Sequence, residues 1–415
     1  MRKMRDSGIE WVGAIPQNWQ LSKIGNLYTQ RNEKVSDKDY QPLSVTMQGI
    51  LPQLATAAKT DDGDNRKLVR VGDFAINSRS DRRGSCGISP LDGSVSLINI
   101  ILTPRTAMHP GYYNWLFHTT LFADEFYKWG HGIVADLWTT RWQEMKSITV
   151  PVPEYAEQER IAAFLDAECA EIDAVLEKTR ASIEEYKKLK QAVITQAVTK
   201  GIRGDRPMKD SGIEWIGDIP VEWDVIRVKQ LLKERNERSK EGKEEPLSMS
   251  QKVGLVPTKF LESIPNMASS FVGAKLAYVD DLVFNKLKAH LGVFSVSRYD
   301  GLVSPDYAVY CSTGKSNLKY LEYIFKTPQC IGEFRKKSTG IAAGLMRLYT
   351  EGLFSIYLPY PALSEQEEIA EYLNEKCAGI DALIVKKQQY LTEIENYKKS
   401  LIYEYVTGKK EVHPL

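Results

Sequence analysis

EQERIAAFLDAECAEIDAVLEK, residues 157–178, decides the fold because it occurs again as EQEEIAEYLNEKCAGIDALIVK at 365–386. The two copies align without a gap, at an offset of 208 residues, as far as 199 and 407. Both are polar and free of proline, and their apolar residues recur at alternating spacings of three and four residues. This periodicity predicts two long amphipathic helices. At about 1.5 Å per residue each would be about 60 Å long, so the other copy is the obvious packing partner.

The apolar seam of these expected helices is imperfect. It is interrupted by Thr179, Lys190, Lys387 and Lys398. An antiparallel pair satisfies the pseudo-twofold symmetry that an internal repeat suggests. We therefore expect an antiparallel coiled coil with polar residues at a few seam positions.

A second repeat lies upstream of each helix. DSGIEWVGAIPQNW at 6–19 recurs as DSGIEWIGDIPVEW at 210–223, now at an offset of 204 residues. The chain is therefore a duplicated unit of globular block plus long helix. The tryptophans that recur are expected to anchor the start of each block onto its body or a helix end, in preference to contacting DNA. They are Trp11, Trp19, Trp215 and Trp223.

Composition excludes several classes of protein. The 415 residues carry a net charge of +1, with 43% hydrophobic and 26% charged residues, which is typical of a soluble globular protein of two to three domains. The sequence contains neither an apolar run long enough to span a membrane nor a secretory signal. Five scattered cysteines form no CxxC pair, and five histidines show no metal-ligand spacing. We expect a cytoplasmic protein without a metal site.

The fold class we expect is α+β, with two similar mixed α+β domains separated by the two long helices. Short β-like runs between turn signals, followed by helical patterns at 112–127 and 318–336, support this reading. The expected boundaries are 1–156 for the first domain, 157–200 for the first helix, 201–209 for a linker, 210–362 for the second domain, 363–408 for the second helix and 409–415 for a tail.

Basic patches occur at matching places in the two divergent blocks. Arginine suits guanine, asparagine suits adenine, and lysine or arginine holds phosphates, so these patches are candidate DNA-binding sites. Taken singly, each could also be a solvated run of charges. The candidate residues are Asn77, Arg79, Arg82 and Arg83 in the first block, and Asn285, Lys286, Lys288, Arg335, Lys336 and Lys337 in the second.

Signatures of catalysis are missing from the sequence. It has no NPPY-type or DPPY-type tetrapeptide of an amino-methyltransferase, and no glycine-rich dinucleotide or S-adenosylmethionine fingerprint after a strand. The fragment 313–316 ends like a phosphate-binding loop, but Val309 stands where that motif needs its first glycine. We therefore expect no catalytic residue and no cofactor bound to this chain.

The two repeated motifs, with DDLVFNKLKAHLG at 280–292 and GDFAINSRSDRRG at 72–84, give the chain a recognisable resemblance. In combination they resemble the specificity subunits of Type I restriction-modification enzymes over essentially the whole length. Such a subunit has no catalytic centre. The resemblance implies that each block is a target recognition domain reading one half of a bipartite DNA site, with the helices as the spacer.

The same resemblance implies the partners. Double-stranded DNA would be bound together with two methyltransferase subunits, which use S-adenosylmethionine to methylate adenine, and two motor-nuclease subunits, which use ATP and Mg²⁺. Because the two blocks differ in sequence, the target should be asymmetric. Two alternatives stay open at this point: a self-contained DNA methyltransferase with divergent motifs, and a purely structural coiled-coil connector.

Overall fold

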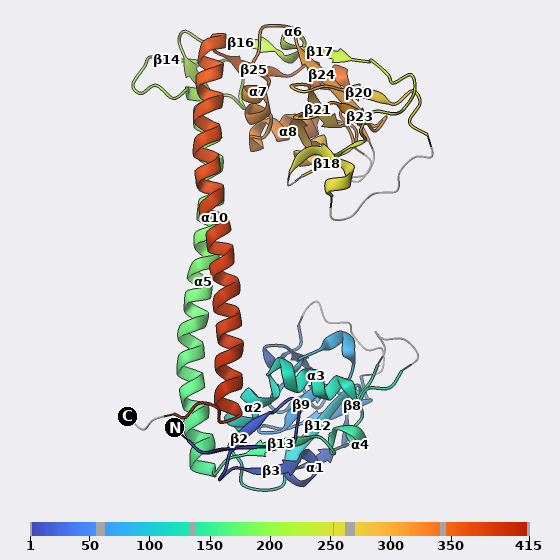
Figure 1. The fold of residues 1–415 in the computed structure, drawn as a ribbon, viewed down its shortest axis with the longest axis vertical. Helices are drawn as coiled ribbons and strands as arrows, with labels where there is room; N and C mark the ends of the chain where they lie inside the picture. Colours follow the sequence, from blue (N-terminus) through green and yellow to red (C-terminus); the bar gives the residue numbers. More distant parts are fainter. Residues whose placement is uncertain are drawn as a thin grey trace. The chain divides into compact units, whose positions relative to one another are not determined.

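The computed structural model describes residues 2–54, 63–132, 138–251, 253–261, 270–340 and 346–412 (Figure 1). The chain divides into two compact units: unit 1 is Met1–Arg180 with Gln388–Leu415, and unit 2 is Ala181–Lys387. Each unit combines one mixed α+β block with one segment of each long helix. The helices are α5, Tyr155–Lys200, and α10, Leu363–Val406. The expected α+β class is confirmed.

Unit 1 is built on a four-stranded antiparallel sheet in the order β10-β9-β12-β4. Smaller sheets surround it: β11-β8-β5 and the pairs β1-β2, β6-β7 and β3-β13. The strands are β1 Met4–Asp6, β2 Ala14–Pro16, β3 Gln20–Lys23, β4 Tyr28–Arg31, β5 Lys34–Val35, β6 Leu43–Thr46, β7 Gly49–Pro52, β8 Arg66–Val69, β9 Phe74–Asn77, β10 Cys86–Ile88, β11 Gly93–Val95, β12 Asn99–Pro104 and β13 Thr149–Val152.

Unit 2 repeats this topology, except that a two-stranded sheet, β20-β23, stands where unit 1 has the three-stranded sheet β11-β8-β5. Its four-stranded sheet has the order β22-β21-β24-β17, and its pairs are β14-β15, β16-β25, β18-β19 and β20-β23. The strands are β14 Met208–Asp210, β15 Asp218–Pro220, β16 Asp224–Arg227, β17 Leu232–Arg235, β18 Leu247–Ser250, β19 Gly254–Pro257, β20 Lys275–Ala277, β21 Leu282–Asn285, β22 Phe294–Val296, β23 Gly301–Val303, β24 Tyr307–Ser312 and β25 Tyr357–Tyr360. Strands β9 and β21 are therefore equivalent.

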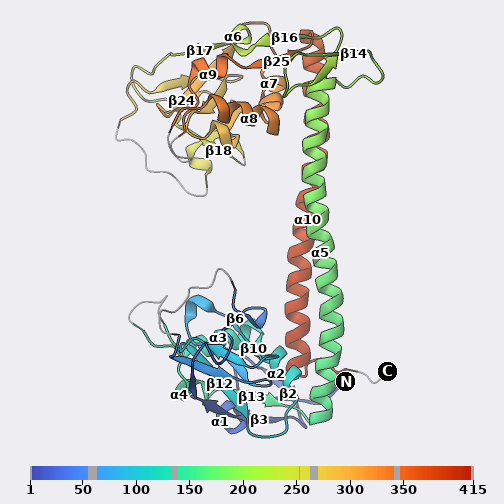
Figure 2. The ribbon, with the colours of Figure 1, turned by 180° about the vertical axis from the view of Figure 1, so that it is seen from behind.

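The helices of each block lie beside its main sheet, as the view from behind shows for α2, α3, α7 and α8 (Figure 2). The helical patterns expected at 112–127 and 318–336 each contain two helices. The break falls at Thr119 in unit 1 and at Thr327 in unit 2, where the threonine side chain accepts a hydrogen bond from the first turn of the next helix. The short helices are α1 Ile24–Leu27, η1 Ser80–Arg82, α2 Pro110–Phe117, α3 Thr120–Lys128, α4 Trp142–Met145, α6 Val228–Leu231, η3 Thr258–Phe260, η4 Ala289–Leu291, α7 Leu318–Phe325, α8 Pro328–Lys337 and α9 Thr350–Phe354.

Ion pairs between the long helices explain two of the four polar seam positions, Lys190 and Lys398. In unit 1, Lys398 of α10 pairs with Asp173 of α5 at 2.6 Å. In unit 2, Lys190 of α5 pairs with Asp381 of α10 at 2.5 Å. Lys398 and Asp381 lie 208 residues after Lys190 and Asp173, so the same pair recurs with the helices exchanged. Lys190 and Lys398 are therefore each neutralised by a carboxylate of the facing helix, whereas the Nζ atom of Lys387 lies 5.7 Å from the centroid of the Tyr186 ring.

The direction of the helices within a unit follows from the order of their contacts. In unit 1, the rings of Phe164 and Tyr405 lie 4.4 Å apart, and further along the helices Arg180 pairs with Glu395 at 2.6 Å. The contacts ascend along α5 and descend along α10. The two segments therefore run in opposite directions within unit 1.

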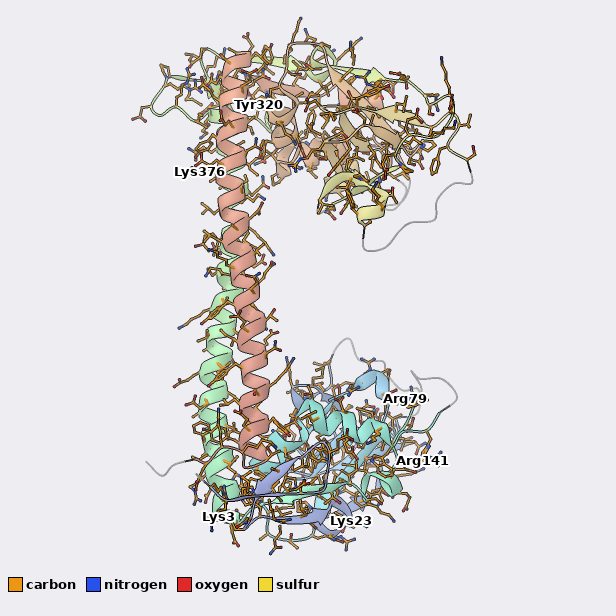
Figure 3. All side chains as sticks on the ribbon, viewed as in Figure 1. Lys3, Lys23, Arg79, Arg141, Tyr320 and Lys376 are labelled. Carbon is orange, nitrogen blue, oxygen red and sulfur yellow. The ribbon has the colours of Figure 1, made fainter. Side chains whose placement is uncertain are left out.

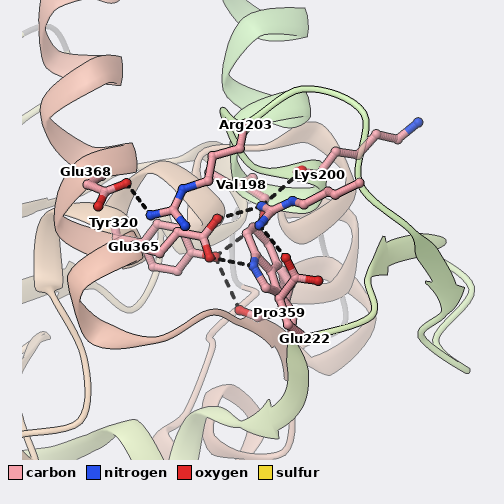
Figure 4. A network of polar contacts seen from close by, with 10 residues as sticks. Val198, Lys200, Arg203, Glu222, Tyr320, Pro359, Glu365 and Glu368 are labelled. Atoms are coloured by element: carbon pink, nitrogen blue, oxygen red, sulfur yellow. Dashed lines mark hydrogen bonds and ion pairs between the residues drawn. The ribbon is translucent and has the colours of Figure 1, made fainter.

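A buried carboxylate ties the start of each long helix to its block. In unit 2, Glu365 of α10 accepts a hydrogen bond from Trp223 Nε1 at 2.9 Å and pairs with Arg206 at 2.5 Å (Figure 4). In unit 1, Glu157 of α5 takes the same two contacts, from Trp19 Nε1 at 3.0 Å and from Arg2 at 2.5 Å. The anchoring role expected for these two tryptophans is confirmed.

The C-terminal end of the other long helix also contacts each block, close to this buried carboxylate. The Tyr320 hydroxyl donates to the carbonyl oxygens of Val198, at the end of α5, and Pro359, both at 3.4 Å. In unit 1, the Tyr112 hydroxyl donates to Val406 O, at the end of α10, at 2.8 Å. Each hydrophobic core therefore includes the end of one long helix and the start of the other.

The buried ion pair in unit 2 yields a stability prediction. Glu365→Ala leaves Arg206 and the Trp223 indole without their shared carboxylate, in a corner where the Arg206 side chain is only 10% exposed. We expect the free energy of unfolding to fall by about 3 kcal/mol, seen as a lower midpoint of urea unfolding followed by tryptophan fluorescence. The control is Glu368→Ala, which breaks an exposed pair with Arg203 and should leave the midpoint unchanged. Equal midpoints for both variants would contradict the anchoring role.

Candidate nucleic-acid interface

A turn of the same length follows β9 in unit 1 and β21 in unit 2, and its short 3-10 helix lies at 80–82 in the first and one position later, at 289–291, in the second. The first turn is closed by a hydrogen bond from Asn77 N to Ser85 O at 2.9 Å, and the second by one from Asn285 N to Val293 O at 3.1 Å. We call residues 77–85 turn 1 and residues 285–293 turn 2. Both lie at the same end of equivalent strands, so the fold displays the same structural element twice.

The asparagines shape these turns. Asn77 Oδ1 accepts a hydrogen bond from Arg79 N at 3.0 Å, and Asn285 Oδ1 accepts one from Leu287 N at 3.1 Å. Asn77 is only 6% exposed. Such side-chain to backbone bonds two residues ahead are typical of Asx turns. The structure therefore gives both asparagines a turn-forming role, whereas the sequence predicted them as readers of bases.

A glycine in the left-handed region completes each turn. Gly84 has φ +77° and Gly292 has φ +76°. A side chain is strained in that conformation, so glycine is needed at both positions. The pair Asn and Gly, seven residues apart, thus has a structural explanation in both units.

An aspartate fixes the start of the strand that leads into each turn. Asp73 binds Arg31 Nε at 2.8 Å, and Asp281 binds Arg235 Nε at 2.8 Å. Both aspartates are buried. The same Arg–Asp pair therefore supports the strand that leads into the turn in both units.

A second segment runs beside each turn. Thr140 N donates to Ser78 O at 3.0 Å in unit 1, and Leu348 N donates to Lys286 O at 3.0 Å in unit 2. The donor and the acceptor of this hydrogen bond each match between the two units at an offset of 208 residues. The neighbouring residues 133–137 and 341–345 lie outside the described part of the chain.

Turn 1 presents the three arginines expected there. Arg79, Arg82 and Arg83 are all exposed, and Figure 3 labels Arg79 at the surface of unit 1. Arg82 lies 3.7 Å from Asp81, and Arg83 is paired with Asp124 of α3. Among the described residues, no carboxylate lies within 4 Å of Arg79. Its guanidinium is therefore the one most available to a ligand.

Turn 2 carries lysines in place of arginines. Lys288 is exposed, whereas Lys286 is partly buried and its Nζ donates to Pro305 O at 3.4 Å. Burial lowers the pKa of Lys286, and the nearby charges of Lys275 and Arg347 lower it further. Two carboxylates, Asp306 and Glu234, oppose this effect. These two cations and two anions are paired with each other, so the positive charge of Lys286 itself is the surplus of this cluster.

The third predicted cluster lies at the C-terminal end of α8. Arg335, Lys336 and Lys337 are exposed in its last turn, and Lys336 pairs with Glu333 at 2.7 Å. Cations at a helix C-terminus are also favoured by the helix dipole, so part of their role is local. Burial lowers the pKa of His290 in turn 2, and the charge of Arg335 lowers it further, which places this cluster near the turn.

Several residues at these sites were not identified from the sequence. Lys275 and Arg347 join the cations of unit 2, with Arg347 bound to Asp306 at 2.9 Å. In unit 1, the exposed Trp138 accepts a hydrogen bond at its carbonyl from Ser80 N at 3.0 Å, and thus lies next to turn 1. Each is distant from its turn in sequence and belongs to no run of charges, so only the fold brings it close.

The described residues offer neither a metal site nor a membrane span. In the part of the chain that the structure describes, no group of three or more His, Cys, Asp and Glu is placed to hold a metal ion. His413 lies outside that part. None of the described helices is long and apolar enough to cross a membrane.

Known proteins with similar sequences are specificity subunits. The chain is 24% identical over 288 residues to the Type I restriction enzyme MjaVIII specificity subunit of Methanocaldococcus jannaschii, a match that covers 65% of this chain and 64% of that protein. It is 22% identical over 294 residues to the EcoDI specificity subunit of Escherichia coli, covering 64% and 63%. The matches thus span slightly less than two thirds of these relatives. No family model matches the chain.

Solved structures share the fold. One, from work on complex assembly and conformational transition of the type I R-M system, has a TM-score of 0.72 at 13% identity and covers 95% of this chain and 99% of its own. The HsdS subunit of Thermoanaerobacter tengcongensis has a TM-score of 0.54 at 15% identity, covering 98% and 100%. The fold of this chain is thus shared with these solved structures. The resemblance to Type I specificity subunits, expected from the repeated motifs, is confirmed.

The role of the asparagines can be tested by hydrogen exchange. Asn77→Ala and Asn285→Ala each remove one hydrogen bond to a turn amide, which contributes about 1 kcal/mol. We expect exchange at the amides of Arg79 and Leu287 to quicken about fivefold, measured by mass spectrometry of peptides covering the two turns. Asn32→Ala, at an exposed asparagine outside the turns, should leave both peptides unchanged. If the two turn variants exchange like the unmodified chain, the Asx bonds do not hold the turns.

Proposed function

We propose that this chain is the DNA sequence-specificity subunit of a Type I restriction-modification complex. The observation that carries the proposal is the pair of turns with the same closing hydrogen bond, asparagine and left-handed glycine but different, cation-rich side chains. The similarity to proteins named as specificity subunits supports it. Residues 1–156 and 210–362 act as the two target recognition domains, and each reads one half of an asymmetric bipartite site.

The positive charges that favour DNA binding are gathered at the two turns. The net charge of +1 gives no general attraction to DNA, so binding depends on where cations gather. Turn 1 displays Arg79 and Arg82, and turn 2 displays Lys288 beside the cation cluster of Lys286 and Arg347. DNA phosphates would compensate the surplus positive charge at the second turn, while base edges supply the sequence information.

The long helices act as the spacer between half-sites. We propose an antiparallel coiled coil with a pseudo-twofold repeat, extending over 157–200 and 363–408, with 201–209 as linker and 409–415 as tail. Residues 413–415 of this tail lie outside the described part of the chain. The reciprocal pairs Asp173–Lys398 and Lys190–Asp381 support one register, because charged partners at a seam disfavour shifted alignments.

The catalytic chemistry belongs to partner subunits in this proposal. Two methyltransferase subunits bring S-adenosylmethionine and methylate adenine, and two motor-nuclease subunits use ATP and Mg²⁺, all in the cytoplasm. The chain itself is non-catalytic and scaffolds these partners. The outward faces of the helices are the docking candidates, and they include exposed Tyr390 and Tyr397 on α10. Methyl transfer by the purified chain alone, with labelled S-adenosylmethionine, would favour a self-contained methyltransferase instead.

Selection from a random DNA pool tests the reading function. We expect the chain, alone or with its methyltransferase, to enrich two short motifs separated by a constant gap. A pool without enrichment in either sample would favour a structural connector.

Cation variants should then separate affinity from sequence preference. Lys286→Ala and Lys288→Ala are each expected to weaken binding to all sequences and to reduce the slope of log affinity against log salt by about 1. The control is Lys23→Ala, which removes an exposed lysine of β3 in unit 1. Figure 3 shows that Lys23 lies apart from Arg79 of turn 1, so this variant should leave the slope unchanged. Equal slopes for all three variants would exclude turn 2 from the DNA contact.

The spacer role predicts a shift in the gap. Deleting residues 180–186 together with 388–394 removes one heptad from each helix and keeps both lysine–aspartate pairs. The helices shorten by about 10 Å, which corresponds to about three base pairs. We expect the selected gap to change accordingly, while a heptad deleted from one helix only should abolish assembly. An unchanged gap with full binding after the double deletion would contradict the spacer role.

A further inference from the structure

Turn 1 and turn 2 share the features that close and support them, although their short 3-10 helices lie one position apart. The closing hydrogen bond, the asparagine acceptor and the left-handed glycine occur in both. The buried salt bridge at the start of the preceding strand recurs with the same 2.8 Å distance, Arg31–Asp73 in one unit and Arg235–Asp281 in the other. The support beneath the two turns is therefore equivalent.

The side chains between these fixed points are different at every position. Residues 78–83 are SRSDRR in turn 1, and residues 286–291 are KLKAHL in turn 2. A shared frame that carries exchanged side chains suits two domains that present equivalent turns to different chemical surfaces. Stability alone gives no reason to place Arg79 in one turn where Leu287 stands in the other.

The position two residues after the asparagine is the best defined. The backbone N–H of Arg79 is held by Asn77, and that of Leu287 by Asn285, so the backbone at this position is held before any ligand arrives. Arg79 is exposed and has no carboxylate within 4 Å among the described residues. A guanidinium in this state can donate two parallel hydrogen bonds to the O6 and N7 atoms of guanine.

Leu287 offers a different surface. It is partly exposed, and Leu291 in the same turn is 49% exposed. Neither can donate a hydrogen bond, so they can only supply apolar contact. In the major groove, the C5 methyl group of thymine is the base feature that apolar side chains recognise.

We propose that residues 78–83 and 286–291 are interchangeable base-reading segments, in which Arg79 selects guanine in one half-site and Leu287 selects thymine in the other. This inference rests on the proposed function, because it assigns the specificity of the same DNA-binding surfaces. It also separates the roles in turn 2, where Lys286 and Lys288 contact phosphates on either side of the base-reading Leu287.

The test uses the full chain with its methyltransferase and selection from random DNA. Arg79→Ala should lose the preference for one guanine in a single half-site, by about tenfold or more, and leave the other half-site unchanged. Leu287→Arg should replace a thymine by a guanine in the second half-site only. Arg79→Lys keeps the charge but not the bidentate geometry, so it should retain affinity and lose the guanine preference.

Exchange of the whole segment is the most stringent test of this inference. Replacing residues 286–291 by the sequence SRSDRR should make the second half-site resemble the first. If the unmodified chain enriches a bipartite motif but the exchange and the point variants enrich the same motif at similar affinity, the turns do not read bases and this inference is wrong. If the unmodified chain enriches no motif, the proposed function itself fails. Leu287→Arg tests the second turn independently if the exchanged segment prevents folding.

Discussion

A buried carboxylate at the first turn of each long helix is the constraint on which the rest of the structure depends. Glu157 and Glu365 each receive an indole N–H from the opening segment of the block and a guanidinium from the residues before it. Both stand near a helix N-terminus, where a negative charge is favoured. One ionised group therefore fixes the start of a helix, the start of a domain and the packing of a tryptophan. Its loss would affect all three.

The reciprocal lysine–aspartate pairs act on the helices in a similar way. A purely apolar seam could shift by one heptad with little loss, whereas Asp173 and Lys398 meet in one alignment only. The same applies to Lys190 and Asp381 within unit 2. Interruptions of the seam thus help to specify which residues face each other. This matters if the helices set a distance between half-sites.

Much of the fold could be predicted from the sequence, because duplication makes its main features visible. The long helices and the anchoring tryptophans follow from repeated motifs. The breaks at Thr119 and Thr327 were not predicted, because a threonine cap leaves the apolar periodicity almost intact.

The candidate site was less predictable. Runs of charge located both turns, but they gave no indication that Asn77 and Asn285 bind backbone amides, since asparagine suits a turn and a base equally well. Arg347 reaches Lys286 only through a bridge between distant segments, so charge runs could not identify it. What the sequence showed as two different basic patches is, in the structure, a pair of turns with the same closing frame and different side chains.

Photo-crosslinking tests the central claim, that both turns contact DNA, most directly. A benzophenone amino acid would be placed at Ser80 and, in a second variant, at the equivalent Lys288, with Lys23 as the control position, in complexes with the selected target. The account predicts crosslinks from 80 to one half-site and from 288 to the other, and none from 23. Crosslinks from neither turn, in complexes that still bind the target specifically, would contradict it.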